Sequence, residues 1–172
     1  MTEVWNEVLS SIRADFSDLP STAEITQVIV RLVLAALLGG LLGFEREQAG
    51  KAAGVRTHML VALGSAFFVL IPVQAGIERG DLSRVLQGVI TGVGFLGAGT
   101  ILKGNHKGQI YGLTTAAGIW FTAAVGIAAG LGREATALLG TILAFLILTV
   151  VPNVVSKHPK DESGNDDQTN AE

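Results

Sequence analysis

The chain has 172 residues, of which 49% are hydrophobic and 16% charged, with 22 glycines, no cysteine and a net charge of −3. A soluble domain of this size carries about a quarter charged residues, so the composition argues against a soluble domain and indicates a polytopic membrane protein. The missing cysteines exclude disulfides, thiolate metal sites and a cysteine nucleophile, and the charge gives no reason to expect nucleic acid as a partner.

Residues 1–20 predict a short amphipathic helix. They carry acidic residues throughout and have no continuous apolar core, which distinguishes them from a signal peptide. Their apolar residues recur at helical spacing: Val4, Trp5, Val8, Leu9, Ile12 and Phe16. Such a helix either lies on the membrane surface or packs loosely on the rest of the protein.

Five segments approach the roughly 20 apolar residues that a helix needs to cross a bilayer. They are residues 24–44, 57–75, 85–102, 113–131 and 135–151. A capping-box pattern at Ser21–Glu24 starts the first, and Pro152 is expected to stop the last. We therefore expect an all-α bundle of about five transmembrane helices over residues 21–156, followed by a polar, disordered tail at 157–172.

Basic residues beside the spans predict the orientation. One side would carry seven of them: Arg46, Lys51, Arg56, Lys103, Lys107, Lys157 and Lys160. The other side would carry four: Arg13, Arg79, Arg84 and Arg133. The positive-inside rule then places the N-terminus outside and the C-terminus in the cytoplasm.

Small residues line the third and fourth spans. Gly88 and Gly92 form a GxxxG pair that Gly99 continues, and a second stripe holds Thr115, Gly118, Thr122, Gly126 and Ala129. Small residues allow helix backbones to approach closely in lipid, so close packing within the bundle is the favoured interpretation. A homodimer face and a narrow pore lining are the alternatives.

Arg31 is the single charge well inside a span. It lies roughly 10 Å from the outer end of the first span, so its side chain can extend outward to the headgroups. Glu45 lies on nearly the same face, about 21 Å further along the helix, which is too far for direct pairing. If both side chains face inward, they mark the two ends of one polar track.

The carboxylates Glu45 and Glu47, together with His58 and His106, raise the question of a metal site. Carboxylates suit Mg²⁺, but an interfacial ion network that includes Arg46 explains the same residues. No acidic residue lies near the middle of a span, where an ion transporter would be expected to need one. We therefore expect no resident metal or other cofactor.

Enzymatic motifs are missing from the sequence. It contains no P-loop, HExxH or GxSxG pattern. Residues 92–97 match GxGxxG, but that motif binds dinucleotides only between a strand and a soluble helix, and here it lies within an apolar span. The sequence therefore predicts a protein without catalytic residues.

Five motifs in a fixed order resemble the MgtC/SapB family of bacterial inner-membrane proteins. They are LLGFERE (41–47), GVRTHMLVALG (54–64), GFLGAGTI (94–101), GLTTAA (112–117), and Trp120 followed by AAVGIAAG (123–130). The resemblance covers about residues 25–132. It implies a five-span domain in the bacterial inner membrane, associated with low-magnesium adaptation and virulence.

The resemblance also implies a role and candidate residues. Family members in pathogens resemble regulators of other membrane complexes, with the F-type ATP synthase as proposed partner, whereas the family label often says magnesium transport. We expect the chain to lack the soluble C-terminal domain of virulence-type members, and it has Thr114 where some of them have asparagine. We expect a non-enzymatic regulator in the lipid bilayer, with a cation transporter as alternative and a homo-oligomer as a further assembly. The candidate functional residues are Arg31, Glu45, Arg46, Glu47, Arg56, Thr57, His58, Gly94, Gly97, Gly99, Thr114 and Thr115.

Overall fold

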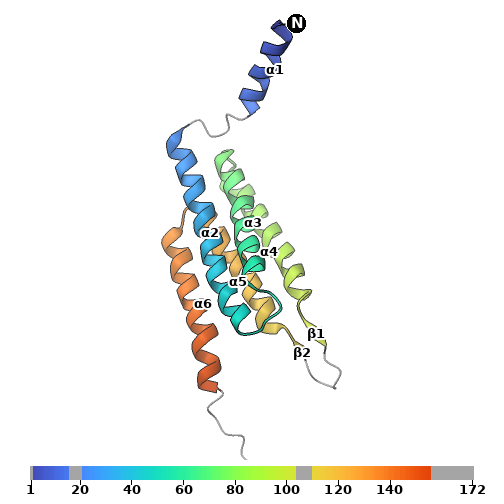
Figure 1. The fold of residues 1–172 in the computed structure, drawn as a ribbon, viewed down its shortest axis with the longest axis vertical. Helices are drawn as coiled ribbons and strands as arrows, with labels where there is room; N and C mark the ends of the chain where they lie inside the picture. Colours follow the sequence, from blue (N-terminus) through green and yellow to red (C-terminus); the bar gives the residue numbers. More distant parts are fainter. Residues whose placement is uncertain (1, 16–20, 104–109, 156–172) are drawn as a thin grey trace, which may run out of the picture.

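The computed structural model describes residues 2–15, 21–103 and 110–155, which form six helices and one small hairpin. Helix α1 (Thr2–Asp15) precedes a bundle of α2 (Thr22–Gln48), α3 (Val55–Gln74), α4 (Arg79–Ala98), α5 (Leu113–Gly130) and α6 (Glu134–Val155) (Figure 1). Two short strands, β1 (Leu102–Lys103) and β2 (Ile110–Tyr111), pair antiparallel between α4 and α5. The expected all-α membrane-type bundle is confirmed, and the hairpin is an addition to it.

Four helices in the described part of the chain are long and apolar enough to cross a membrane. They are α2, α3, α5 and the Glu134–Pro152 part of α6. The segment expected as a third span, 85–102, differs from the prediction: its helix α4 starts earlier, at Arg79, and ends at Ala98. The last helix also differs, because Pro152 lies inside α6, which continues to Val155.

Helix α1 is the predicted amphipathic N-terminal helix. Figure 1 shows it extending beyond the bundle, and its described side chains are exposed, including Trp5 and Leu9. Its location on a membrane surface stays a prediction. The polar tail at 157–172 lies outside the described residues.

Capping explains where α2 begins. The backbone N–H of Glu24 donates to Oγ of Ser21 at 3.2 Å, which satisfies one of the free donors of the first turn. The capping box predicted from the sequence is thereby confirmed on its serine side.

The core is built from small residues around α3, which packs mainly against α2 and α5. Ala62 and Ala66 of α3 are fully buried and meet Ala35 of α2 and Ala129 of α5 in one cluster. Gly130 shows why size matters, since an added Cβ would lie 2.6 Å from the carbonyl oxygen of Ala66. In lipid, such close backbone approach supplies the dispersion contacts that hold helices together.

The packing prediction is right for α5 and wrong for most of α4. Four residues of the predicted α5 stripe are buried: Thr115, Thr122, Gly126 and Ala129. On α4, by contrast, a Cβ added at Gly88, Gly92 or Gly94 would meet no atom within 4 Å. These glycines therefore leave surface open instead of closing a helix contact within the bundle.

The two ends of the bundle differ in what they carry. Figure 1 shows the end of α2, the start of α3, the β1–β2 hairpin and the end of α6 at one end, which we call the hairpin end. Helix α1 and the α3–α4 turn lie at the opposite end. Lys107, Lys157 and Lys160 of the predicted basic group lie outside the described residues, so the orientation in the membrane stays a prediction.

Candidate functional site

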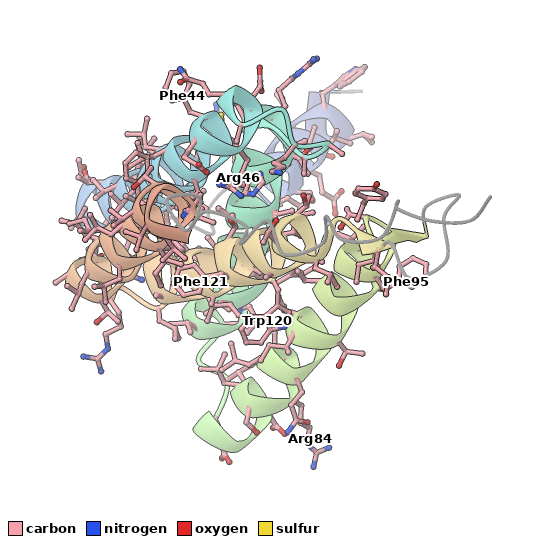
Figure 2. All side chains as sticks on the ribbon, turned by 90° about the horizontal axis from the view of Figure 1, so that it is seen from below. Phe44, Arg46, Arg84, Phe95, Trp120 and Phe121 are labelled. Atoms are coloured by element: carbon pink, nitrogen blue, oxygen red, sulfur yellow. The ribbon has the colours of Figure 1, made fainter. Side chains whose placement is uncertain are left out.

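Arg46 and Glu45 form a buried ion pair in the last turn of α2. Nε and Nη2 of Arg46 donate to the two carboxylate oxygens of Glu45, with Nη2–Oε1 at 2.5 Å. Arg46 is only 4% exposed, and Figure 2 shows it pointing into the bundle while Phe44 points outward. This bidentate contact offsets the charge of the guanidinium and so allows its burial.

Glu47 closes the connection between α2 and α3. Its Oε2 accepts a hydrogen bond from the backbone N–H of Val55, the first residue of α3, at 2.9 Å. The preceding residue, Gly54, has no side chain to cap the helix, and a Cβ there would overlap the Glu47 carboxylate. Glu47 therefore acts as a remote cap at the positive end of the helix dipole.

His58 lies in the helix interface one turn into α3 and is completely buried. Its Nδ1 is 3.0 Å from the carbonyl oxygen of Gly54. A carbonyl can only accept, so the hydrogen-bond network assigns the ring proton to Nδ1 and leaves a lone pair on Nε2. Nε2 is buried without a hydrogen-bond partner, as is Oγ1 of Thr122.

Glycines of α2 hold this cluster together. A Cβ at Gly39 would lie 2.6 Å from the carbonyl oxygen of His58, and one at Gly43 would lie 2.7 Å from Cα of Val55. The sequence reasoning missed both residues. The GxxxG spacing of Gly39 and Gly43 is the signal in the sequence that indicates a close helix contact at this position.

The other predicted functional residues at the hairpin end differ in how exposed their side chains are. Arg56 and Thr57 are exposed and line a cavity of about 590 Å³ together with Glu47. Thr114 is exposed, whereas Thr115 is buried in the packed face of α5.

The three predicted glycines of α4 have different surroundings. Gly94 is exposed with open space around it, and Gly97 packs against Ala116 of α5. Gly99 is the C-cap of the helix. The structure does not bring these glycines to the Arg46 cluster as one site.

Arg31 belongs to the opposite end of the bundle. Its Nε is 3.7 Å from Oε1 of Glu134 at the start of α6, and its guanidinium lies where a Cβ of Gly132 would be. Between Arg31 and Glu45, the same side of α2 presents buried Ala35, Leu38 and Leu42. The polar track considered from the sequence is therefore wrong, because an apolar core separates its two ends.

The described residues do not gather into a metal site. Among them, no group of three or more His, Asp or Glu side chains could hold an ion. Glu45 pairs with Arg46, and Glu47 caps α3. His106, the fourth residue of the hypothetical site, lies outside the described residues.

Comparison with known proteins decides the family. The sequence profile of the MgtC family matches residues 32–157, which include the whole Glu45–His58 cluster. The chain belongs to the MgtC family. SrpB of Synechococcus elongatus is 47% identical over 133 residues, which cover 69% of this chain and 71% of SrpB.

Two other relatives carry informative names. The Escherichia coli protein named "Putative magnesium transporter YhiD" is 43% identical over 136 residues, covering 75% of this chain and 61% of YhiD. Protein MgtC of Brucella abortus is 43% identical over 115 residues, covering 66% of this chain and 46% of that protein. The match thus spans less than two thirds of these two relatives. No solved structure matches the chain.

Proposed function

We propose that this MgtC-family protein is a non-enzymatic regulator that contacts another membrane complex through a groove between α3 and α4. The groove has a volume of about 640 Å³ and is lined by Gly64 of α3 and by Gly88 and Gly92 of α4. A Cβ at any of these three glycines would meet nothing within 4 Å. This open, glycine-lined surface is the observation that carries the proposal.

The groove fits an apolar helix of another protein. Along α3 it extends from Leu60 to Phe68, which is about 12 Å or two helical turns. Glycines on both walls allow a third backbone to approach, and that is how transmembrane helices associate in lipid. The neighbouring Phe68 and Leu96 are exposed large side chains that would flank such a helix.

The packing of the bundle interior favours a role in binding another protein over a role in cation transport. An ion crossing the bundle would need a path between its helices. The contacts of Gly39 with α3 and of Gly130 with Ala66 instead bring the helix backbones together there. In the described part of the chain, no carboxylate is fully buried, and the largely buried Glu45 is already paired with Arg46. Mg²⁺ prefers oxygen ligands and keeps several waters, so an interior of this kind offers it little.

A groove-filling variant tests the proposal. Gly88→Leu places a side chain in the groove, with a Cβ that meets no atom within 4 Å, and Gly94→Leu places the same side chain on open α4 surface outside the groove. In co-purification from native membranes, Gly88→Leu should lose a partner that Gly94→Leu and the unmodified chain retain. The F-type ATP synthase is the partner suggested by the family resemblance. Loss of the partner in both variants, or in neither, would contradict the groove as its binding surface.

Cation transport is the second candidate, because the name of the YhiD relative refers to a magnesium transporter. The purified protein in liposomes should then carry Mg²⁺ faster than empty liposomes do. Glu47→Gln tests the exposed carboxylate of the hairpin end without uncovering the buried Arg46. Flux no higher than in empty liposomes would end this candidate.

Localisation and physiological role belong to the same proposal. Residence in the bacterial inner membrane, a role in low-magnesium adaptation and an outside N-terminus follow from the family resemblance and the basic loops. Reporter fusions after Asp15 and after Val155 should report opposite sides of the membrane, with the second in the cytoplasm. Reporters on the same side would contradict the predicted topology.

A further inference from the structure

A cavity at the hairpin end lies between the end of α2, the start of α5 and the last turns of α6, and we call it the α2–α6 cavity. Its volume is about 650 Å³, and it shares no lining residue with the α3–α4 groove. The wall that α6 supplies is largely apolar, with Ile147 and Val151 exposed. The wall that follows from α2 carries three charged residues, Glu45, Arg46 and Lys51. The cavity therefore suits a molecule that has both an apolar and a charged part.

Arg46 offers this cavity a donor group that the protein leaves unused. Its Nε and Nη2 donate to Glu45, whereas Nη1 has no hydrogen-bond partner in the described part of the chain. The unpartnered side-chain atoms that are sealed from solvent there are Nε2 of His58 and Oγ1 of Thr122, and Nη1 is not one of them. Nη1 thus keeps some accessible surface although Arg46 as a whole is buried, and Arg46 lines the cavity. The free edge of a guanidinium is a strong donor to an anionic oxygen.

The electrostatics of the α2–α6 cavity favour an anion. Both carboxylate oxygens of Glu45 already accept hydrogen bonds from Arg46, so this pair of charges is balanced. Lys51 is exposed and adds one further positive charge to the lining. Thr114, another lining residue, belongs to the first turn of α5, and the N-cap of that helix, Gly112, has no side chain to cap it. The positive end of the α5 dipole therefore lies at the same cavity.

We propose that the α2–α6 cavity binds the phosphate group of an anionic phospholipid such as phosphatidylglycerol, with Nη1 of Arg46 and the ammonium group of Lys51 as donors. A guanidinium matches the geometry of phosphate oxygens, and a phosphodiester carries the single negative charge that complements Lys51. The apolar wall on α6 would lie against an acyl chain. Inorganic phosphate has the same donor requirements but gains nothing from that wall.

Two lipids with the same chains provide the probe. Dioleoylphosphatidylglycerol carries a phosphodiester, and dioleoylglycerol has no phosphate. Native mass spectrometry of the purified full chain should show the phospholipid binding about tenfold more tightly, which is the worth of one hydrogen bond between charged groups. Equal binding of the two lipids, or binding of neither, would overturn the proposal.

Inorganic phosphate distinguishes a lipid site from a site for a free anion. The unfolding temperature of the chain in phosphate-free detergent should rise when dioleoylphosphatidylglycerol is added and should not rise with inorganic phosphate. A rise with inorganic phosphate alone would show that the cavity takes a free anion, and it would overturn the lipid as the ligand.

Matched variants of two exposed basic residues locate the site. Lys51→Gln removes the charge that lines the α2–α6 cavity and should weaken binding of the phospholipid about three- to fivefold. Arg56→Gln removes an exposed basic residue at the same end that does not line this cavity, and it should leave the affinity unchanged. Equal losses from the two variants would show a general attraction to the basic end and would refute the cavity as the site.

A double variant tests the guanidinium itself. Glu45→Gln combined with Arg46→Met removes both charges of the buried pair and leaves the net charge of the chain as it was. It should lose most of the preference for dioleoylphosphatidylglycerol over dioleoylglycerol, and a preference that survives would refute Arg46 as the donor. Helical circular dichroism checks that the double variant folds, and the comparison of Lys51→Gln with Arg56→Gln decides the matter if it does not.

Discussion

Glu45→Gln should destabilise the protein strongly, because it leaves the guanidinium of Arg46 buried without a counter-charge. Arg46 is 4% exposed, and the side chain of Glu45 is 12% exposed, so solvent screens the pair little. Removing one partner of a buried pair costs about 3–5 kcal/mol. The glutamine keeps one acceptor for Arg46, so we expect the free energy of unfolding to fall by about 3 kcal/mol, which changes the unfolding equilibrium roughly a hundredfold.

The assay is unfolding of the purified protein in mixed micelles by SDS, followed by tryptophan fluorescence and helical circular dichroism. The double variant Glu45→Gln, Arg46→Met removes both charges and should recover much of the lost stability, since a buried ion pair is often replaceable by apolar residues. If Glu45→Gln lies within about 0.5 kcal/mol of the unmodified chain, or if the double variant is no more stable than the single one, the buried-pair interpretation is wrong.

Three smaller predictions follow from other contacts. Glu47→Gln should cost about 1 kcal/mol in the same unfolding assay, because it weakens the cap at Val55; a change above about 3 kcal/mol would point to another role. Gly126→Ala should destabilise the bundle by about 1–3 kcal/mol, since its methyl group would overlap the carbonyl of Ala62, and unchanged stability would contradict that close contact. Arg31→Gln should cost at most about 1 kcal/mol, because its ion pair to α6 is partly exposed; a larger loss would show that the pair matters more than its exposure allows.

The helices were predictable because apolar runs and caps are local signals. Ser21 caps α2 as its pattern predicts. The boundaries of α4 were less accurate, since glycine-rich sequence is compatible with both a helix and a turn. The hairpin of β1 and β2 has only two residues per strand, which is too short for a periodic pattern to reveal.

The candidate site was predictable in composition but not in arrangement. The charges of Glu45, Arg46 and Glu47 were identified, yet their roles depend on the folded geometry. Adjacent residues on a helix normally point apart, so nothing in the sequence shows that Glu45 turns back onto Arg46. The cap from Glu47 to Val55 likewise spans eight residues and depends on how α2 and α3 meet.

Burial was the other quantity that the sequence could not supply. His58 reads as a polar residue at a helix entrance, but the glycines of α2 bring that helix close enough to cover it completely. Gly88 and Gly39 have the same type of spacing in the sequence and opposite surroundings in the fold. Only the positions of neighbouring helices distinguish a glycine that closes a contact from one that leaves a groove open.

Site-specific photocrosslinking in native membranes tests the central claim most directly. A benzophenone side chain replaces either Phe68, which lines the α3–α4 groove, or Phe67, an exposed neighbour that does not line it. The contact role predicts an adduct with a different membrane protein from position 68 and not from position 67. Adducts with lipid or a second copy of the chain alone from position 68, or the same protein adduct from both positions, would contradict it.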